Sequence, residues 1–195
     1  MLKLAMEIKL TSDNGLQLNG KRETVLINPS SELLKTSAAR IVIYAKEQVK
    51  HGLLTEDNRV IIIGPGEYEI GGVEVLGYGD GSGGFVYTVL IDGVTVGLLG
   101  RLTTELSEKK VDRIGSVDVL VADIGENNVS GNKSLLKLAK GWGVNYLLPV
   151  GYKMGEQAIQ DFLNLTDNEG MEAVSGLKID KDNLPEGLEV VLLHE

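Results

Sequence analysis

The order of strand and helix patterns is the feature that most constrains how this chain can fold. Its first half contains mainly strand patterns, in which apolar residues alternate with polar ones or form short apolar runs. Asp92-Gly93 lies between two of these runs and is a strong signal for a tight hairpin turn. The strands predicted here cover residues 4–10, 24–27, 40–44, 59–63, 72–76, 85–91 and 94–98.

The second half of the chain alternates between helix and strand patterns. Helices are predicted over residues 105–114, 132–141 and 155–165, and short strands over 117–121, 145–150 and 188–193. Strands followed by strand–helix units predict an α/β fold, with mixed sheets covered by helices on their outer faces. The chain has 195 residues, a length that fits one domain covering residues 1–195.

Composition excludes several classes of protein. The formal net charge is −9, whereas nucleic-acid binders usually carry a basic patch, so no nucleic-acid partner is expected. No run of about 18 apolar residues is present, which predicts that the chain does not span a membrane. The chain has no cysteine and begins without a signal peptide's apolar region, so we expect a cytoplasmic protein without disulfides.

Several segments, in this order along the chain, resemble the metallo-β-lactamase superfamily. They are residues 25–29, 64–70 (Gly-Pro-Gly-Glu-Tyr-Glu-Ile), 91–93, 99–100, 116–120, 148–149 and 179–185. Within that superfamily, the chain looks most like the small metal-dependent hydrolases similar to ascorbate-6-phosphate lactonase. The resemblance implies an αββα four-layer sandwich, in which helices flank two facing mixed sheets. It also implies an active site at one edge of the sheets and metal-dependent hydrolysis.

The positions that should hold the metal carry other side chains. The superfamily's HxHxDH motif follows the strand over residues 40–44, and its late histidine follows a strand that ends in proline and valine. The expected histidines fall on Ala45, Glu47, Lys50 and Gly151, and the expected aspartates fall on Val49 and Arg101. The whole chain has only two histidines, His51 and His194, so a shift of register cannot restore a set of ligands. We therefore predict no metal, no cofactor and no catalytic residues of the superfamily's kind.

Two of the replaced positions carry cations, Lys50 and Arg101, and their positive charges would repel a divalent ion. Arg101 either substitutes for the lost metal charge by pairing with Glu47 or Asp123, or is a solvated arginine at the end of a strand. His51 is interpreted as a loop or helix-end histidine, and His194 as an exposed residue near the end of the chain.

Three interpretations of function stay open. The first is a non-catalytic binding or assembly module, either holding a small anionic molecule near Lys50, Arg101 and Gly151 or forming a homo-oligomer. The second is a metal-dependent hydrolase of phosphoesters or lactones with a relocated site of oxygen ligands. The third is a subunit of a larger complex. Carboxylates that could build the relocated site are Glu67, Glu69, Asp80, Asp123 and Glu126.

Two further segments have a structural interpretation. The glycine-rich stretch 77–84 lacks the lysine of a phosphate-binding loop and precedes a strand, so it is predicted to be a hairpin connection. Trp142 follows a predicted helix and is expected to pack the helix end against a sheet.

Overall fold

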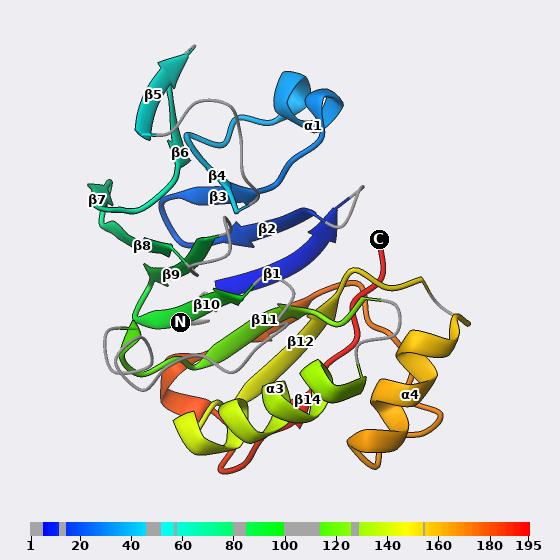
Figure 1. Cartoon of the computed structure of the whole chain (residues 1–195). Helices are drawn as coiled ribbons and strands as arrows, with labels where there is room; N and C mark the ends of the chain where they lie inside the picture. The colour runs from blue at the N-terminus through cyan, green and yellow to red at the C-terminus, as the bar shows by residue number, and fades with distance from the viewer. Residues whose placement is uncertain are drawn as a thin grey trace.

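The fold is built from two β-sheets that face each other, with helices outside both (Figure 1). The computed structural model describes residues 6–11, 15–45, 52–56, 58–79, 85–99, 114–125, 129–153 and 155–195. Within these ranges, none of the helices combines the length and apolar character needed to cross a membrane.

The first sheet has seven strands in the order β13-β1-β2-β3-β4-β6-β5. Strands β3, β4 and β6 are parallel to one another, and the other neighbours pair antiparallel. The strands are β1 (Met6–Thr11), β2 (Gly15–Asn19), β3 (Thr24–Ile27), β4 (Ile41–Tyr44), β5 (Gly52–Glu56), β6 (Arg59–Ile63) and β13 (Leu177–Ile179).

The second sheet also has seven strands, in the order β14-β12-β11-β10-β9-β8-β7. Strands β7 to β10 form an antiparallel meander, whereas β10, β11, β12 and β14 are parallel. The strands are β7 (Gly66–Ile70), β8 (Val73–Gly79), β9 (Phe85–Ile91), β10 (Val94–Leu99), β11 (Val119–Asp123), β12 (Tyr146–Val150) and β14 (Glu189–Val190).

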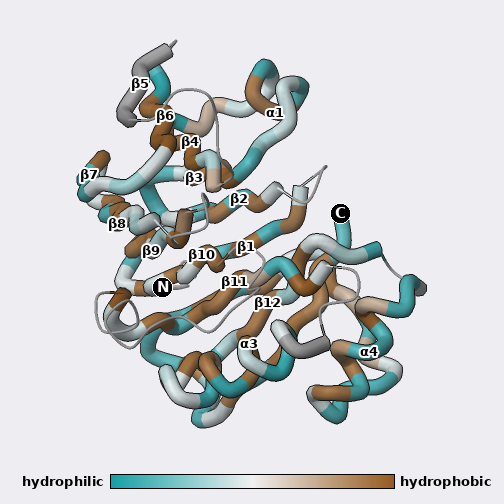
Figure 2. Tube along the Cα trace, viewed as in Figure 1, coloured by the Kyte–Doolittle hydropathy of each residue, from teal (hydrophilic) through white to brown (hydrophobic). Residues whose placement is uncertain are grey.

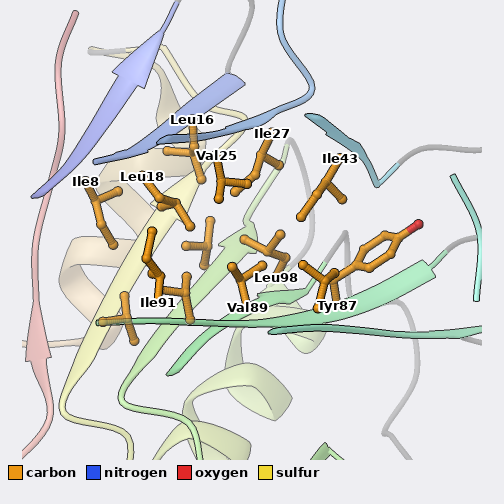
Figure 3. Close-up of a cluster of buried hydrophobic side chains, with 14 of the residues drawn as sticks. Ile8, Leu16, Leu18, Val25, Ile27, Ile43, Tyr87, Val89, Ile91 and Leu98 are labelled. Carbon is orange, nitrogen blue, oxygen red and sulfur yellow. The ribbon is translucent and has the colours of Figure 1, made fainter. Parts of the chain in front are cut away.

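A single apolar cluster fills the space between the sheets and draws side chains from both of them. Figure 3 shows Ile8, Val25 and Ile43 of the first sheet facing Val89, Ile91 and Leu98 of the second. Side chains alternate between the two faces of a strand, so the apolar residues of each strand reach this layer together. Figure 2 shows the same concentration of hydrophobic residues along the inner strands.

Helices cover the outer face of each sheet. Helix α1 (Ser31–Thr36) packs Leu33 and Leu34 over the first sheet, and helices α3 (Val129–Trp142) and α4 (Gln157–Leu165) cover the second. Helix α4 buries Ile159, Phe162 and Leu163, whose spacing places them on one helical face. A short 3-10 helix, η2 (Lys181–Asn183), precedes β14. The predicted α/β sandwich with outer helices is confirmed.

The sequence located some elements accurately and missed or displaced others. The strands over residues 24–27, 59–63 and 85–91 were predicted with their observed bounds, and Trp142 packs on the helix side of the second sheet as expected. Strands β2, β5, β7 and β13 and helix α1 were not predicted.

Several predicted boundaries were wrong. Residues 77–79 continue β8, because they pair with β9, instead of opening the hairpin connection. Helix α3 begins at Val129 rather than at residue 132, and β11 begins at Val119 rather than at residue 117. In the predicted strand 188–193, only Glu189–Val190 is regular. Most of the helix predicted over 105–114 lies outside the described residues.

Candidate functional site

The carboxyl ends of the parallel strands of both sheets meet at one edge of the sandwich. Tyr87 on β9 shows this, because it lies opposite Leu98 near the end of β10 while its hydroxyl contacts the residue that follows β6. The same hydroxyl lies 3.4 Å from the carbonyl oxygen of Tyr44, the last residue of β4. The ends of β4, β6 and β10 are therefore neighbours, and we call this side of the sandwich the cleft edge.

The Tyr87 hydroxyl fastens the loop after β6 to the second sheet. Its oxygen accepts a hydrogen bond from the backbone nitrogen of Gly64 at 2.8 Å, and it lies 3.1 Å from the Gly64 carbonyl oxygen, to which it can donate. Figure 3 shows the ring at one end of the apolar cluster with its hydroxyl beyond it. Burial raises the pKa of Tyr87 to about 12, so the hydroxyl keeps its proton at neutral pH.

The loops that follow β3 and β4 are joined by Asn28. This residue has a positive φ of 47°, a conformation that asparagine tolerates better than most residues. Its backbone nitrogen donates to Ile43 at 2.8 Å, and its side-chain oxygen accepts from the backbone nitrogen of Ala45 at 2.8 Å. Ala45 is thus held in place, and its side chain packs against the apolar cluster.

Gly151 and Asp123 lie side by side at the ends of β12 and β11. Asp123 pairs in register with Val150, the residue before Gly151, and is half-buried. Gly151 has a φ of +78°, and a Cβ atom at this position would lie 2.7 Å from the Asp123 carboxyl carbon. Position 151 therefore disfavours a side chain for two reasons: its backbone is left-handed, and the Asp123 carboxylate would have to move.

Comparison with known proteins assigns the chain to a family. The model of the β-lactamase superfamily domain matches residues 7–151. The chain belongs to the metallo-β-lactamase superfamily. Among curated proteins, none matches the chain.

Solved structures of the superfamily share the fold at low sequence identity. A member from Thermotoga maritima is 24% identical, with a TM-score of 0.74, covering 96% of this chain and 98% of that chain. The metallo-β-lactamase-fold protein YhfI from Bacillus subtilis is 9% identical, with a TM-score of 0.60 and coverage of 97% and 96%. Igni18, a metallo-hydrolase from Ignicoccus hospitalis, is 10% identical, with a TM-score of 0.59 and coverage of 90% and 99%.

The described cleft-edge residues do not fit the superfamily's metal centre. Ala45 and Gly151 stand at two positions where the resemblance places histidines, and neither has a side chain that can bind a metal. In the part of the chain that the structure describes, no three His, Cys, Asp or Glu side chains come together as metal ligands. Glu47, Val49, Lys50 and Arg101 lie outside the described residues, so the pairing of Arg101 with Glu47 or Asp123 stays a prediction.

The carboxylates considered for a relocated site are dispersed as far as they are described. Glu67 and Glu69 are exposed on β7, an edge strand four positions away from β11 in the sheet. At about 4.8 Å per strand, they lie roughly 19 Å from the strand that carries Asp123. Asp80 and Glu126 lie outside the described residues. Asp123 is therefore separated across the sheet from the other two described members of that set.

Sequence reasoning missed the residues that shape the cleft edge. Tyr87 lies within an ordinary apolar strand, and nothing in the strand pattern marks its hydroxyl. Asn28 offered a weak signal, because asparagine before proline at the end of a strand favours a turn.

Tyr152 packs on the helix side of the second sheet, where its hydroxyl donates to the carbonyl oxygen of Leu193 at 3.3 Å and burial raises its pKa. His194 is exposed, as expected.

Proposed function

We propose that this protein is a non-catalytic member of its superfamily that keeps the sandwich as a cytoplasmic binding or assembly module. The observation that carries the proposal is the lack of space for a side chain at Gly151. A histidine there would need an L-residue in a left-handed conformation and would displace the Asp123 carboxylate. Both the backbone conformation and the neighbouring carboxylate thus disfavour a histidine at this position.

The organisation of the cleft edge supports the same proposal. Protein groups hold the loops around it, since Asn28 joins the loops after β3 and β4, and Tyr87 holds the loop after β6. In a metal-dependent enzyme, the ligands themselves would help to position such loops. Here the fold is maintained by ordinary hydrogen bonds and apolar packing.

A small anion is the ligand we propose for the former active-site cleft. The support comes from the sequence, which places the cations Lys50 and Arg101 at two positions of the metal-binding motifs. A guanidinium stays charged and can form two parallel hydrogen bonds with a carboxylate or phosphate. The net charge of −9 argues against nucleic acid as the partner. Assembly into a homo-oligomer is the other form that a binding module could take.

Metal analysis of the purified protein tests the proposal. Untagged protein is dialysed against zinc and then manganese, freed of unbound ions, and analysed for bound metal. We expect well below one metal ion per chain and no hydrolysis of lactone or phosphoester substrates. Stoichiometric metal together with hydrolysis would overturn the proposal.

An Asp123→Asn variant identifies the alternative hydrolase if metal is found. Loss of bound metal and activity in this variant would establish a relocated site that uses Asp123. A Glu69→Gln variant is the matched control, because Glu69 is exposed on the distant strand β7. Light scattering on the unmodified protein then separates a monomeric ligand-binding module from a homo-oligomer.

A further inference from the structure

A pocket lies at the edge of the sandwich opposite the cleft edge. Its volume is about 360 Å³, and three turns form it: residues 20–23 between β2 and β3, Gly71-Gly72 between β7 and β8, and Asp92-Gly93 between β9 and β10. Figure 3 shows Ile91, next to this pocket, at the other end of the apolar cluster from Tyr87. The pocket is therefore separate from the site discussed above.

The turns around the pocket are fixed to one another. The two hairpin turns have positive φ at both central residues, 61° and 83° in Gly71-Gly72 and 51° and 83° in Asp92-Gly93, which is typical of tight hairpins. They lie on neighbouring hairpins, because Glu74 of β8 pairs with Leu90 of β9. The backbone nitrogen of Lys21 donates to the Asp92 carboxylate at 2.6 Å, which joins the turn of the first sheet to the second sheet.

The carboxylates of the pocket have partners within the protein, whereas its cations are exposed. The Glu23 side chain is only 10% exposed and forms an ion pair with Arg40 at 2.7 Å. The Asp92 carboxylate accepts the hydrogen bond from the Lys21 backbone. The side chains of Lys21 and Arg22 are exposed and form no ion pair with any other described residue. The Glu23 charge is thus paired with Arg40, and Asp92 is oriented by a backbone hydrogen bond, whereas the cationic ends of Lys21 and Arg22 are exposed to a ligand.

We propose that this pocket binds a small molecule that carries phosphate or carboxylate groups. Arg22 can form paired hydrogen bonds with such an oxyanion, and Lys21 adds a second positive charge. Gly72 leaves the backbone of its turn accessible to a ligand, because a Cβ atom there would meet no other atom within 4 Å, whereas the Glu23 carboxylate lies against Gly71. The pocket is at the small end of the range of about 300–1,000 Å³ that is typical of small-molecule sites, so a metabolite fits it better than a macromolecule.

The buried apolar part of the lining sets the shape of the ligand. Val73 and Ile91 also line the pocket, and both are almost fully buried, at 2% and 3% exposed. A ligand with an oxyanion at one end and a short apolar or neutral body would match both parts. The site lies at the opposite edge from the cleft, so it can be occupied whether or not the cleft binds anything.

Titration with two oxyanion probes tests the proposal. Pyrophosphate and citrate are added separately to the full-length protein, and binding is followed by calorimetry and by backbone amide NMR shifts. We expect at least one of them to bind with a millimolar or lower dissociation constant and to shift the amides of Arg22, Gly72 and Gly93. The probe that binds more tightly shows whether phosphate or carboxylate is preferred.

Three variants locate the site. A Lys21→Ala/Arg22→Ala variant should weaken binding about tenfold or more, because it removes charge-assisted hydrogen bonds. A Lys133→Ala/Lys140→Ala variant loses the same charge from exposed positions of helix α3 and should bind as the unmodified protein does. A Gly72→Asn variant keeps the net charge and adds a side chain that tolerates a left-handed backbone, so it should also weaken binding.

Several outcomes would overturn the proposal. These are binding of neither probe at millimolar concentration, equal weakening by both double variants, and shifts confined to cleft-edge amides such as those of Asn28 and Gly151. The last outcome would support the proposed function while excluding this pocket. Circular dichroism of each variant confirms that the fold is retained, so a loss of binding can be attributed to the site.

Discussion

Replacing Tyr87 with phenylalanine should destabilise the protein measurably, because one hydroxyl holds the cleft edge together. The ring is fully buried, and its oxygen accepts from Gly64 at 2.8 Å and lies 3.1 Å from the Gly64 carbonyl oxygen. Removing it leaves the buried backbone N–H group of Gly64, in the β6–β7 connection, without its partner. A buried polar group left unsatisfied costs about 1–3 kcal/mol, so we expect the free energy of unfolding to fall by about 2 kcal/mol.

Urea unfolding at pH 8, followed by circular dichroism, measures this change, and thermal unfolding should show a midpoint lower by about 4–8 °C. The matched control is Tyr146→Phe. The Tyr146 ring is half-buried beside the same apolar cluster, and its hydroxyl has no hydrogen bond within the described ranges. We expect that variant to lie within about 0.5 kcal/mol of the unmodified protein. Equal stability of the Tyr87→Phe variant and the unmodified protein would refute the role assigned to the hydroxyl.

Three further predictions concern stability. Burial raises the pKa of Tyr87 to about 12, so the stability that its hydroxyl contributes is complete below pH 10 and is lost as the pH rises to 12. The free energy of unfolding measured in urea should therefore fall more steeply between pH 9 and 12 in the unmodified protein than in Tyr87→Phe. Gly151→Ala should cost at least about 1 kcal/mol more than Gly155→Ala, because both glycines have positive φ but a Cβ meets a carboxylate only at Gly151. Lys181→Met should lower the free energy of unfolding by about 1 kcal/mol, because Lys181 donates at 2.6 Å to Asp118, which is 8% exposed. Equal losses in both glycine variants, or a fully stable Lys181→Met protein, would contradict these explanations.

Local patterns were sufficient to predict the architecture but not the details of the cleft edge. The strand over residues 85–91 follows directly from its apolar run, and the hairpin turn follows from the residue types of Asp92-Gly93. Strand β7 was missed because glutamates alternate with half-buried residues at a sheet edge, and its apolar signal is therefore weak. The scarcity of possible metal ligands also follows from residue identity alone, because the chain has two histidines and no cysteine.

Contacts between distant segments could not be predicted in the same way. The Asp123 carboxylate occupies the space beside Gly151 only because β11 and β12 pair in one particular register. Likewise, Lys21 meets Asp92 across 71 positions of sequence, and no local pattern indicates that contact. The pocket at the opposite edge depends on three turns from both sheets, so it becomes visible only when the sheets are assembled.

These contacts also predict how the protein responds to a chelator. A metal held at 100 times its dissociation constant would add about 2.7 kcal/mol to stability, which corresponds to roughly 5–10 °C for a domain of this size. The cleft-edge loops are instead held by Asn28 and Tyr87, and positions 45 and 151 carry no metal-binding side chain. Thermal unfolding midpoints with excess EDTA and with added zinc should therefore agree within about 1 °C. A midpoint that falls by several degrees in EDTA and recovers with zinc would show that a metal still stabilises this fold, and hydrolysis by the zinc-loaded protein would then overturn the proposed non-catalytic role.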